Sequence, residues 1–305
     1  MKCIFCLKEE TPSEEHVIPE SIGGSIVIKD VCKKCNSNVN SRIDNPFSNT
    51  PLIKLGRFSY GIGGKRDNIP SPFGIGMDEN GLKIAVDKTL TPHVKRKLEI
   101  TKNEDGSFNV VFAADAADKD KLNEILVEPV RKFLAKEYPD WSDEKIENEV
   151  GKVLDAARNA PESKSSGPVK YSWANDFEAI SLEYMKIAYE FWFKEFGFDW
   201  VENSPIAAFM RSALLTGEHA DKVRGQFPCE ELQLPFNNPN DNHCILLFGG
   251  ICYVRLFSLA SKIECDVIGG KYCLDPLNAK LIIQNFKTGE AKERKLSDAI
   301  LEVNM

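Results

Sequence analysis

Two pairs of cysteines could bind a metal ion. Cys3 with Cys6 and Cys32 with Cys35 each have the spacing CxxC, and 25 residues separate the pairs. In such pairs two thiolates face one ion, and four thiolates complete the tetrahedral coordination of Zn²⁺. The pattern therefore predicts a structural zinc ion, which would replace part of the core that a short segment cannot build. Chance spacing and a pair of redox-active CxxC motifs are the alternatives.

A second group of polar residues lies between and just after these cysteines. Glu15 and His16 are adjacent and precede Pro19, a Gly-Gly pair follows, and Asn36 comes directly after Cys35. Carboxylate and amide oxygens suit Mg²⁺ or Mn²⁺, and an imidazole with a pKa of about 6.5 can take a proton from water. These residues could therefore perform metal-assisted hydrolysis. A purely structural histidine at position 16 is the alternative.

In this order, the residues form the pattern (D/E)H-x-x-P, GG, CxxCN, which resembles the zinc-stapled members of the HNH (ββα-metal) endonuclease family over residues 1–45. The resemblance implies that Glu15 and Asn36 bind a catalytic divalent ion such as Mg²⁺ or Mn²⁺. It also implies that His16 is the general base for attack of water on a DNA phosphodiester. The family's base-orienting asparagine is missing before Cys32, so Asp30 or a backbone carbonyl is expected to hold the imidazole.

The charge of the chain restricts how it could contact DNA. The net charge is −7, yet residues 1–66 hold ten Lys and Arg against seven Asp and Glu. A broadly basic nucleic-acid-binding surface is therefore excluded, and any phosphate contact is expected to be local. Lys33, Lys34 and Arg42 are the candidates, with an ordinary solvated surface as the alternative.

The elements around the motif must bring these residues together. Adjacent residues on a strand point to opposite faces, so a strand carrying Glu15 and His16 is expected to bend or end there. A helix is expected to begin near Cys35, with Val39 and Ile43 on its buried face. The opposite face would carry Asn36, Asn40 and Asp44.

Hydrophobic periodicity predicts further elements along the rest of the chain. The expected strands are Leu82–Val86, Lys97–Thr101, Phe108–Phe112, His243–Phe248, Ile251–Leu259, Ile263–Val267 and Leu281–Phe286. The expected helices start near Leu122 and at Ser142 as N-cap, and cover Phe177–Phe196 and Ile206–Leu215. Pro161 to Pro168 is the expected linker.

These patterns predict an α+β fold. Its parts would be a small zinc-stapled ββα-metal module at residues 1–60, a mixed middle segment at 61–160, and a helix-then-sheet C-terminal domain at 161–305. The apolar runs are shorter than the roughly 20 residues of a membrane span. The N-terminus shows no secretory signal, so a cytoplasmic protein with reduced thiols is expected.

The resemblance thus implies a metal-dependent HNH endonuclease that hydrolyses DNA phosphodiester bonds, in a setting such as bacterial restriction or anti-phage defence. The C-terminal domain is expected to receive a partner protein or a regulatory trigger. The alternative is a catalytically weak or inactive zinc-stapled module that binds nucleic acid or protein.

Overall fold

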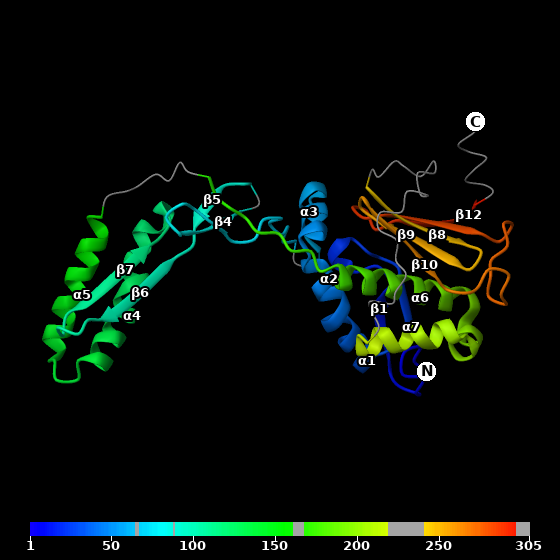
Figure 1. Ribbon diagram of the computed structural model, residues 1–305, viewed down its shortest axis with the longest axis horizontal. Coiled ribbons are helices and arrows are strands. Elements are labelled where there is room, and N and C mark those ends of the chain that lie inside the picture. Colours follow the sequence, from blue (N-terminus) through cyan, green and yellow to red (C-terminus); the bar gives the residue numbers. More distant parts are fainter. Residues whose placement is uncertain (65–66, 88, 161–167, 219–240, 297–305) are drawn as a thin grey trace. The chain divides into compact units, whose positions relative to one another are not determined.

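A computed structural model describes residues 1–64, 67–87, 89–160, 168–218 and 241–296 (Figure 1). The chain divides into two compact units, which are described separately. Unit 1 combines Met1–Pro72 with Ala174–Met305, and unit 2 is Phe73–Trp173. The mixed α+β class is as predicted from the sequence. The three-segment division at residues 60 and 160 stays a prediction.

The N-terminal module of unit 1 is a ββα arrangement. Its strands β1 (Pro12–His16) and β2 (Val27–Cys32) pair antiparallel, with a short 3-10 turn, η1 (Glu20–Ile22), between them. Helix α1 (Lys33–Val39) follows, then a π-helical turn η2 (Asn40–Asp44), α2 (Asn45–Asn49) and α3 (Pro51–Tyr60). The Cys32 side chain accepts a hydrogen bond from the Cys35 amide and caps α1. The helix therefore starts two residues earlier than expected.

The C-terminal part of unit 1 is built on a long buried helix and a sheet. Helix α6 (Phe177–Asn203) is followed by α7 (Pro205–Thr216). The five strands pair antiparallel in the order β10-β9-β8-β11-β12. They are β8 (Asn242–Phe248), β9 (Ile251–Leu256), β10 (Leu259–Glu264), β11 (Lys280–Asn285) and β12 (Ala291–Lys295). Helix α6 packs against α7, β9, β10 and η2, so it connects the module to the sheet (Figure 1).

Helix α6 is the central element of the core of unit 1. Asp176 caps its first turn, with Oδ1 accepting from the Ala179 amide at 2.9 Å. The helix was predicted to end at Phe196, and Gly197 does adopt a non-helical backbone with φ of 63° before the chain continues helically. The same hydrophobic core includes buried module residues such as Ile4 and Phe5. The module therefore does not fold on a core of its own.

The predicted strand boundaries in the C-terminal sheet were partly wrong. A strand over Ile251–Leu259 was expected, but β9 ends at Leu256 and β10 begins at Leu259. The chain turns between them at Phe257, whose φ is 53°. Phe257 is buried, so packing fixes a turn that carries none of the usual Gly, Asn or Pro signals.

Unit 2 contains short strands and a helical hairpin. Its elements are β3 (Gly76–Met77), β4 (Lys83–Val86), β5 (Pro92–Val94), β6 (Lys97–Lys102), β7 (Phe108–Ala113), η4 (Ala116–Lys121), α4 (Leu122–Glu137) and α5 (Asp143–Arg158). Ser142 caps α5, as the sequence indicated. A small core between α4 and α5 includes Leu134 and Ile146. Most of the expected linker, residues 161–167, lies outside the described residues. Among the described helices, none has the length and apolar character that crossing a membrane requires.

Candidate active site and zinc centre

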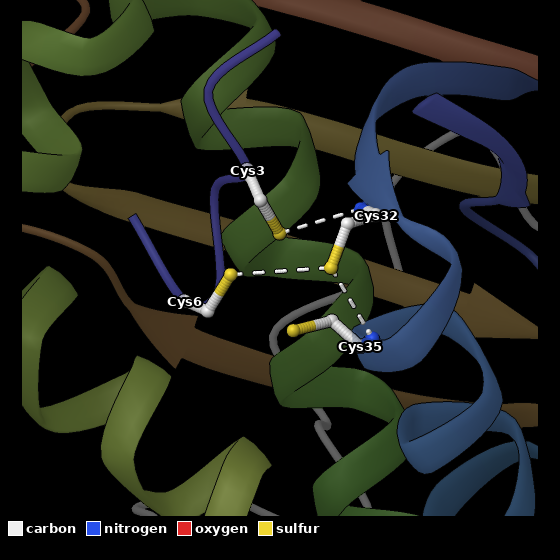
Figure 2. A group of neighbouring side chains, drawn as sticks. All are labelled: Cys3, Cys6, Cys32 and Cys35. Carbon is white, nitrogen blue, oxygen red and sulfur yellow. Dashed lines mark hydrogen bonds between the residues drawn. The ribbon is translucent and has the colours of Figure 1, made fainter. Parts of the chain in front are cut away.

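The four cysteines of the two CxxC pairs converge on one point (Figure 2). Their sulfur atoms all lie within 4.8 Å of one another, and Cys6 Sγ is 3.9 Å from Cys32 Sγ. Four sulfurs at about 2.3 Å from a tetrahedral zinc ion would stand about 3.8 Å apart. The donor set therefore fits a structural zinc ion with four thiolate ligands. Such an ion would hold β2 and α1 against the N-terminal turn and leave no coordination position for substrate.

Backbone amides and burial shape the chemistry of these thiols. The Cys32 amide donates to Cys3 Sγ at 3.4 Å, and the Cys35 amide donates to Cys32 Sγ at 3.5 Å. Burial raises the pKa of the thiols of Cys3 and Cys35. Without metal these two thiols hold their protons at neutral pH, so zinc binding releases protons.

Strand β1 ends at the candidate catalytic histidine. His16 pairs with Val27, and the strand register slips between Ser13 and Glu15. Glu15 is 2% exposed, whereas His16 is partly exposed. The alternation of a strand thus turns Glu15 toward the interior of unit 1 and His16 away from it. The two side chains that the motif places next to each other do not share a face.

The Glu15 carboxylate lies against a fully buried lysine of α6. Glu15 Oε1 is 2.7 Å from Lys186 Nζ. The same ammonium group donates to the backbone carbonyl of His16 and to Asp44 Oδ1, both at 2.9 Å. Burial raises the pKa of Glu15, and the positive charge of Lys186 opposes that shift. Asp44, expected on the polar outer face of its helix, is instead buried against Lys186.

Two further carboxylates of α6 surround this ion pair. Glu183 and Glu190 are fully buried, and their oxygens have no hydrogen-bond partner among the described residues. Burial raises the pKa of both well above its usual value. Burial alone would lower the pKa of Lys186, but the surrounding carboxylates, Asp44 first, hold it well above its usual value. The buried carboxylates around Lys186 therefore favour the charged form of its ammonium group.

Asn36 lies in α1 close to the start of β1. Its Nδ2 donates to the Glu14 carbonyl at 2.7 Å and to Ser13 Oγ at 3.2 Å. Among the described residues, none donates to its Oδ1. The amide oxygen is therefore available to a ligand, while the amide nitrogen holds α1 to β1.

A catalytic divalent ion fits the donor types of the motif but not their placement. Glu15 faces inward and is paired with Lys186, while Asn36 contacts the backbone of β1. Within the described residues, the cysteine cluster is the one group of three or more Cys, His, Asp or Glu side chains close enough to hold an ion. The Glu15 carboxylate is therefore already paired with Lys186, and the binding of a catalytic divalent ion by Glu15 and Asn36 stays a prediction.

The side chains expected to contact DNA and to orient His16 differ in their placement. Lys33 and Lys34 are exposed at the start of α1, where phosphate could reach them. Arg42 donates from Nη1 to the carbonyl of Leu215 at the end of α7. No described residue forms a hydrogen bond with the ring of His16, and this includes Asp30. These residues' functional roles stay predictions.

The C-terminal sheet holds the loop that follows His16. His243 Nε2 lies 2.9 Å from the Ile22 carbonyl oxygen, and Gln284 Nε2 donates to the Gly23 carbonyl at 2.7 Å. The sequence predicted a functional role for neither His243 nor Lys186. Lys186 had a visible signal, since Glu183, Lys186 and Glu190 follow one another at i, i+3 and i+7 with only Tyr, Met, Ile and Ala residues between them.

The comparisons agree with the motif and the geometry of the module. Residues 3–52 match a family model described as HNH endonuclease, HNH_5. No curated protein matches the chain, and no solved structure does. The match covers β1, the glycine loop, β2 and α1, together with all four cysteines. Residues 3–52 of this chain are an HNH endonuclease domain of the HNH_5 family.

Proposed function

We propose that this protein is an endonuclease that hydrolyses DNA phosphodiester bonds, with His16 as the general base. The observation that supports the proposal most is the position of His16 at the end of β1, partly exposed, in a domain of nuclease type. A neutral imidazole there can take a proton from the water that attacks phosphorus.

Other residues of the module support roles around this base. The available Oδ1 of Asn36 can bind an oxygen-seeking cation or a water, and Nδ2 keeps it fixed to β1. Lys33 and Lys34 can each contact a phosphate through an exposed ammonium group. A divalent ion such as Mg²⁺ or Mn²⁺, when bound, would stabilise the negative charge that develops on phosphorus and the leaving oxygen.

A plasmid-cleavage assay tests the proposal. Zinc-loaded protein is incubated with supercoiled DNA and Mg²⁺ or Mn²⁺, beside His16→Ala. The control is His93→Ala, which removes a partly exposed histidine from unit 2. We expect His16→Ala to lose cleavage by about 100-fold or more, as for removal of a general base, and His93→Ala to cleave like the wild type. Equal rates for His16→Ala and wild type would exclude this mechanism.

The alternative is a catalytically weak or inactive zinc-stapled module that binds nucleic acid or protein. Two observations favour it: Glu15 is paired with Lys186, and no described residue orients the ring of His16. Wild-type protein that binds zinc and DNA but cleaves neither DNA nor RNA would support this function. A role in restriction or anti-phage defence, with the C-terminal part receiving a partner or trigger, is tested by phage plating with wild type and His16→Ala.

A further inference from the structure

Lys186 reaches the candidate active site from the far side of β1. Its side chain is fully buried, and an ammonium group has three protons to donate. Three oxygens lie within 2.9 Å of Nζ: the His16 carbonyl oxygen and Asp44 Oδ1, which accept hydrogen bonds, and Glu15 Oε1, which forms an ion pair. Two of them belong to the last two residues of β1, and the third ends η2. One cation thus connects the catalytic strand to the helical segment that carries Asn36.

The Lys186 ammonium group competes with a metal ion for the Glu15 carboxylate. An ion bound to the Glu15 carboxylate would have to enter a site that is 2% exposed. It would also lie close to the ammonium group that is 2.7 Å from Oε1, and like charges repel strongly at low dielectric. Glu14, the neighbouring carboxylate, is exposed and pairs loosely with Lys29 at 3.4 Å. Solvent therefore reaches Glu14 and not Glu15.

We propose that Glu15 is the internal counter-ion of Lys186 rather than a ligand of the catalytic divalent ion, and that Lys186 is a positioning residue for His16. Lys186 acts through the His16 carbonyl, which it holds at the end of β1 while the imidazole faces outward. The positioning role rests on the proposed nuclease function; the assignment of Glu15 does not.

Binding of Mn²⁺ tests the assignment of Glu15. Zinc-loaded full-length protein is titrated with Mn²⁺ and free Mn²⁺ is followed by EPR, for wild type, Glu15→Gln and the matched control Glu14→Gln. We expect Glu15→Gln to bind Mn²⁺ within about twofold of wild type, because Gln keeps an oxygen beside Lys186 and the substitution removes no metal ligand. Loss of a true ligand would weaken binding by about tenfold or more. Such a loss in Glu15→Gln but not in Glu14→Gln would overturn the assignment.

The positioning role is tested with Lys186→Met and the control Lys29→Met, which removes an exposed lysine beside the same strand. We expect Lys186→Met to shift the NMR signals of the His16 ring and to lower kcat for plasmid cleavage by about 100-fold, with KM little changed. Lys29→Met should change neither. A folded, zinc-loaded Lys186→Met with wild-type His16 signals and kcat would overturn the role.

A second variant covers a failure of Lys186→Met to fold. Lys186→Met combined with Glu15→Gln removes both charges of this ion pair together, so no unpaired buried charge is left at position 15. It still lacks the donor to the His16 carbonyl, so the same shift of the ring signals is expected. If wild-type protein cleaves no substrate, the proposed function fails, while Mn²⁺ binding and the His16 signals still decide this inference.

Discussion

The imidazole of His243 and the carbonyl of Ile22 are joined across the interface between the C-terminal sheet and the HNH loop. Nε2 lies 2.9 Å from the Ile22 oxygen, and Nδ1 accepts from the Phe257 amide at 3.4 Å. The ring is fully buried between the rings of Phe257 and Phe286. A neutral imidazole has one N–H donor and one nitrogen acceptor, and these two hydrogen bonds use both. A second proton would destroy the bond at Nδ1.

Stability should therefore fall in mild acid. Burial lowers the pKa of His243 to about 4, below its value of about 6.5 in an unfolded chain. Between these two pKa values only the unfolded state binds the extra proton. The stabilisation of the folded state by neutral His243 is therefore complete above pH 6.5 and is lost as the pH falls toward 4. We expect preferential protonation of His243 in the unfolded state to lower the free energy of unfolding by about 3 kcal/mol on going from pH 7 to pH 4.

Urea unfolding at a series of pH values measures this effect. The comparison is His243→Gln, which keeps a donor and an acceptor but does not titrate in this range. The wild type should lose more stability than the variant on going from pH 7 to pH 4. Parallel stability curves for the two proteins would contradict the prediction.

A methyl group at Gly23 should disturb the same interface. Gly23 has φ of +89°, and a Cβ there would clash with the carbonyl oxygen of Phe286. Gly61 is the matched control, with φ of +71° and open space around its Cα. Gly61→Ala should lower the free energy of unfolding by about 1 kcal/mol, because alanine is strained at this positive φ. Gly23→Ala should cost about 2 kcal/mol more, because the loop must move away from the sheet. Equal losses in urea unfolding would show that the contact with Phe286 is unimportant.

Removal of zinc should unfold the module. Cys32→Ser removes one of four clustered thiols, whereas Cys273→Ser removes a partly exposed thiol whose Sγ donates to the Val267 carbonyl. Metal analysis should find one zinc per chain in the wild type and in Cys273→Ser, and a loss in Cys32→Ser. Since structural zinc contributes several kcal/mol to folding, Cys32→Ser and chelator-treated wild type should both melt at a lower temperature. A Cys32→Ser variant that retains zinc and its melting temperature would refute the four-thiolate site.

The sequence was sufficient wherever a feature depends on local spacing. The two CxxC pairs, the strand that ends at His16 and the cap at Ser142 depend on residues close together in the chain, so their patterns were readable. The same holds for Val39 and Ile43, which lie on the buried face of their helix as expected.

Long-range pairing was not readable from the sequence. Lys186 is 171 residues from Glu15, and His243 is 221 residues from Ile22. No periodicity specifies which buried charge will meet which strand, because that depends on how the elements pack. The motif indicated two functional side chains at positions 15 and 16; strand alternation turns Glu15 inward, and the partner that it meets there, Lys186 of α6, was not readable.

His93 in unit 2 should respond to pH in the opposite direction from His243. Its Nε2 lies 3.2 Å from Asp87 Oδ2, and its Nδ1 lies 3.2 Å from Asp115 Oδ2. The hydrogen bond with Asp87, followed by that with Asp115, raises the pKa of His93. Because this pKa is raised in the folded state, the stabilisation by protonated His93 is complete below about pH 6.5. It is lost as the pH rises through the pKa of His93 in the folded state. NMR titration should show His93 titrating above free histidine and His243 below it. Asp87→Asn should lower the pKa of His93 and leave that of His243 unchanged; an unchanged His93 would show that the contact with Asp87 does not form in solution.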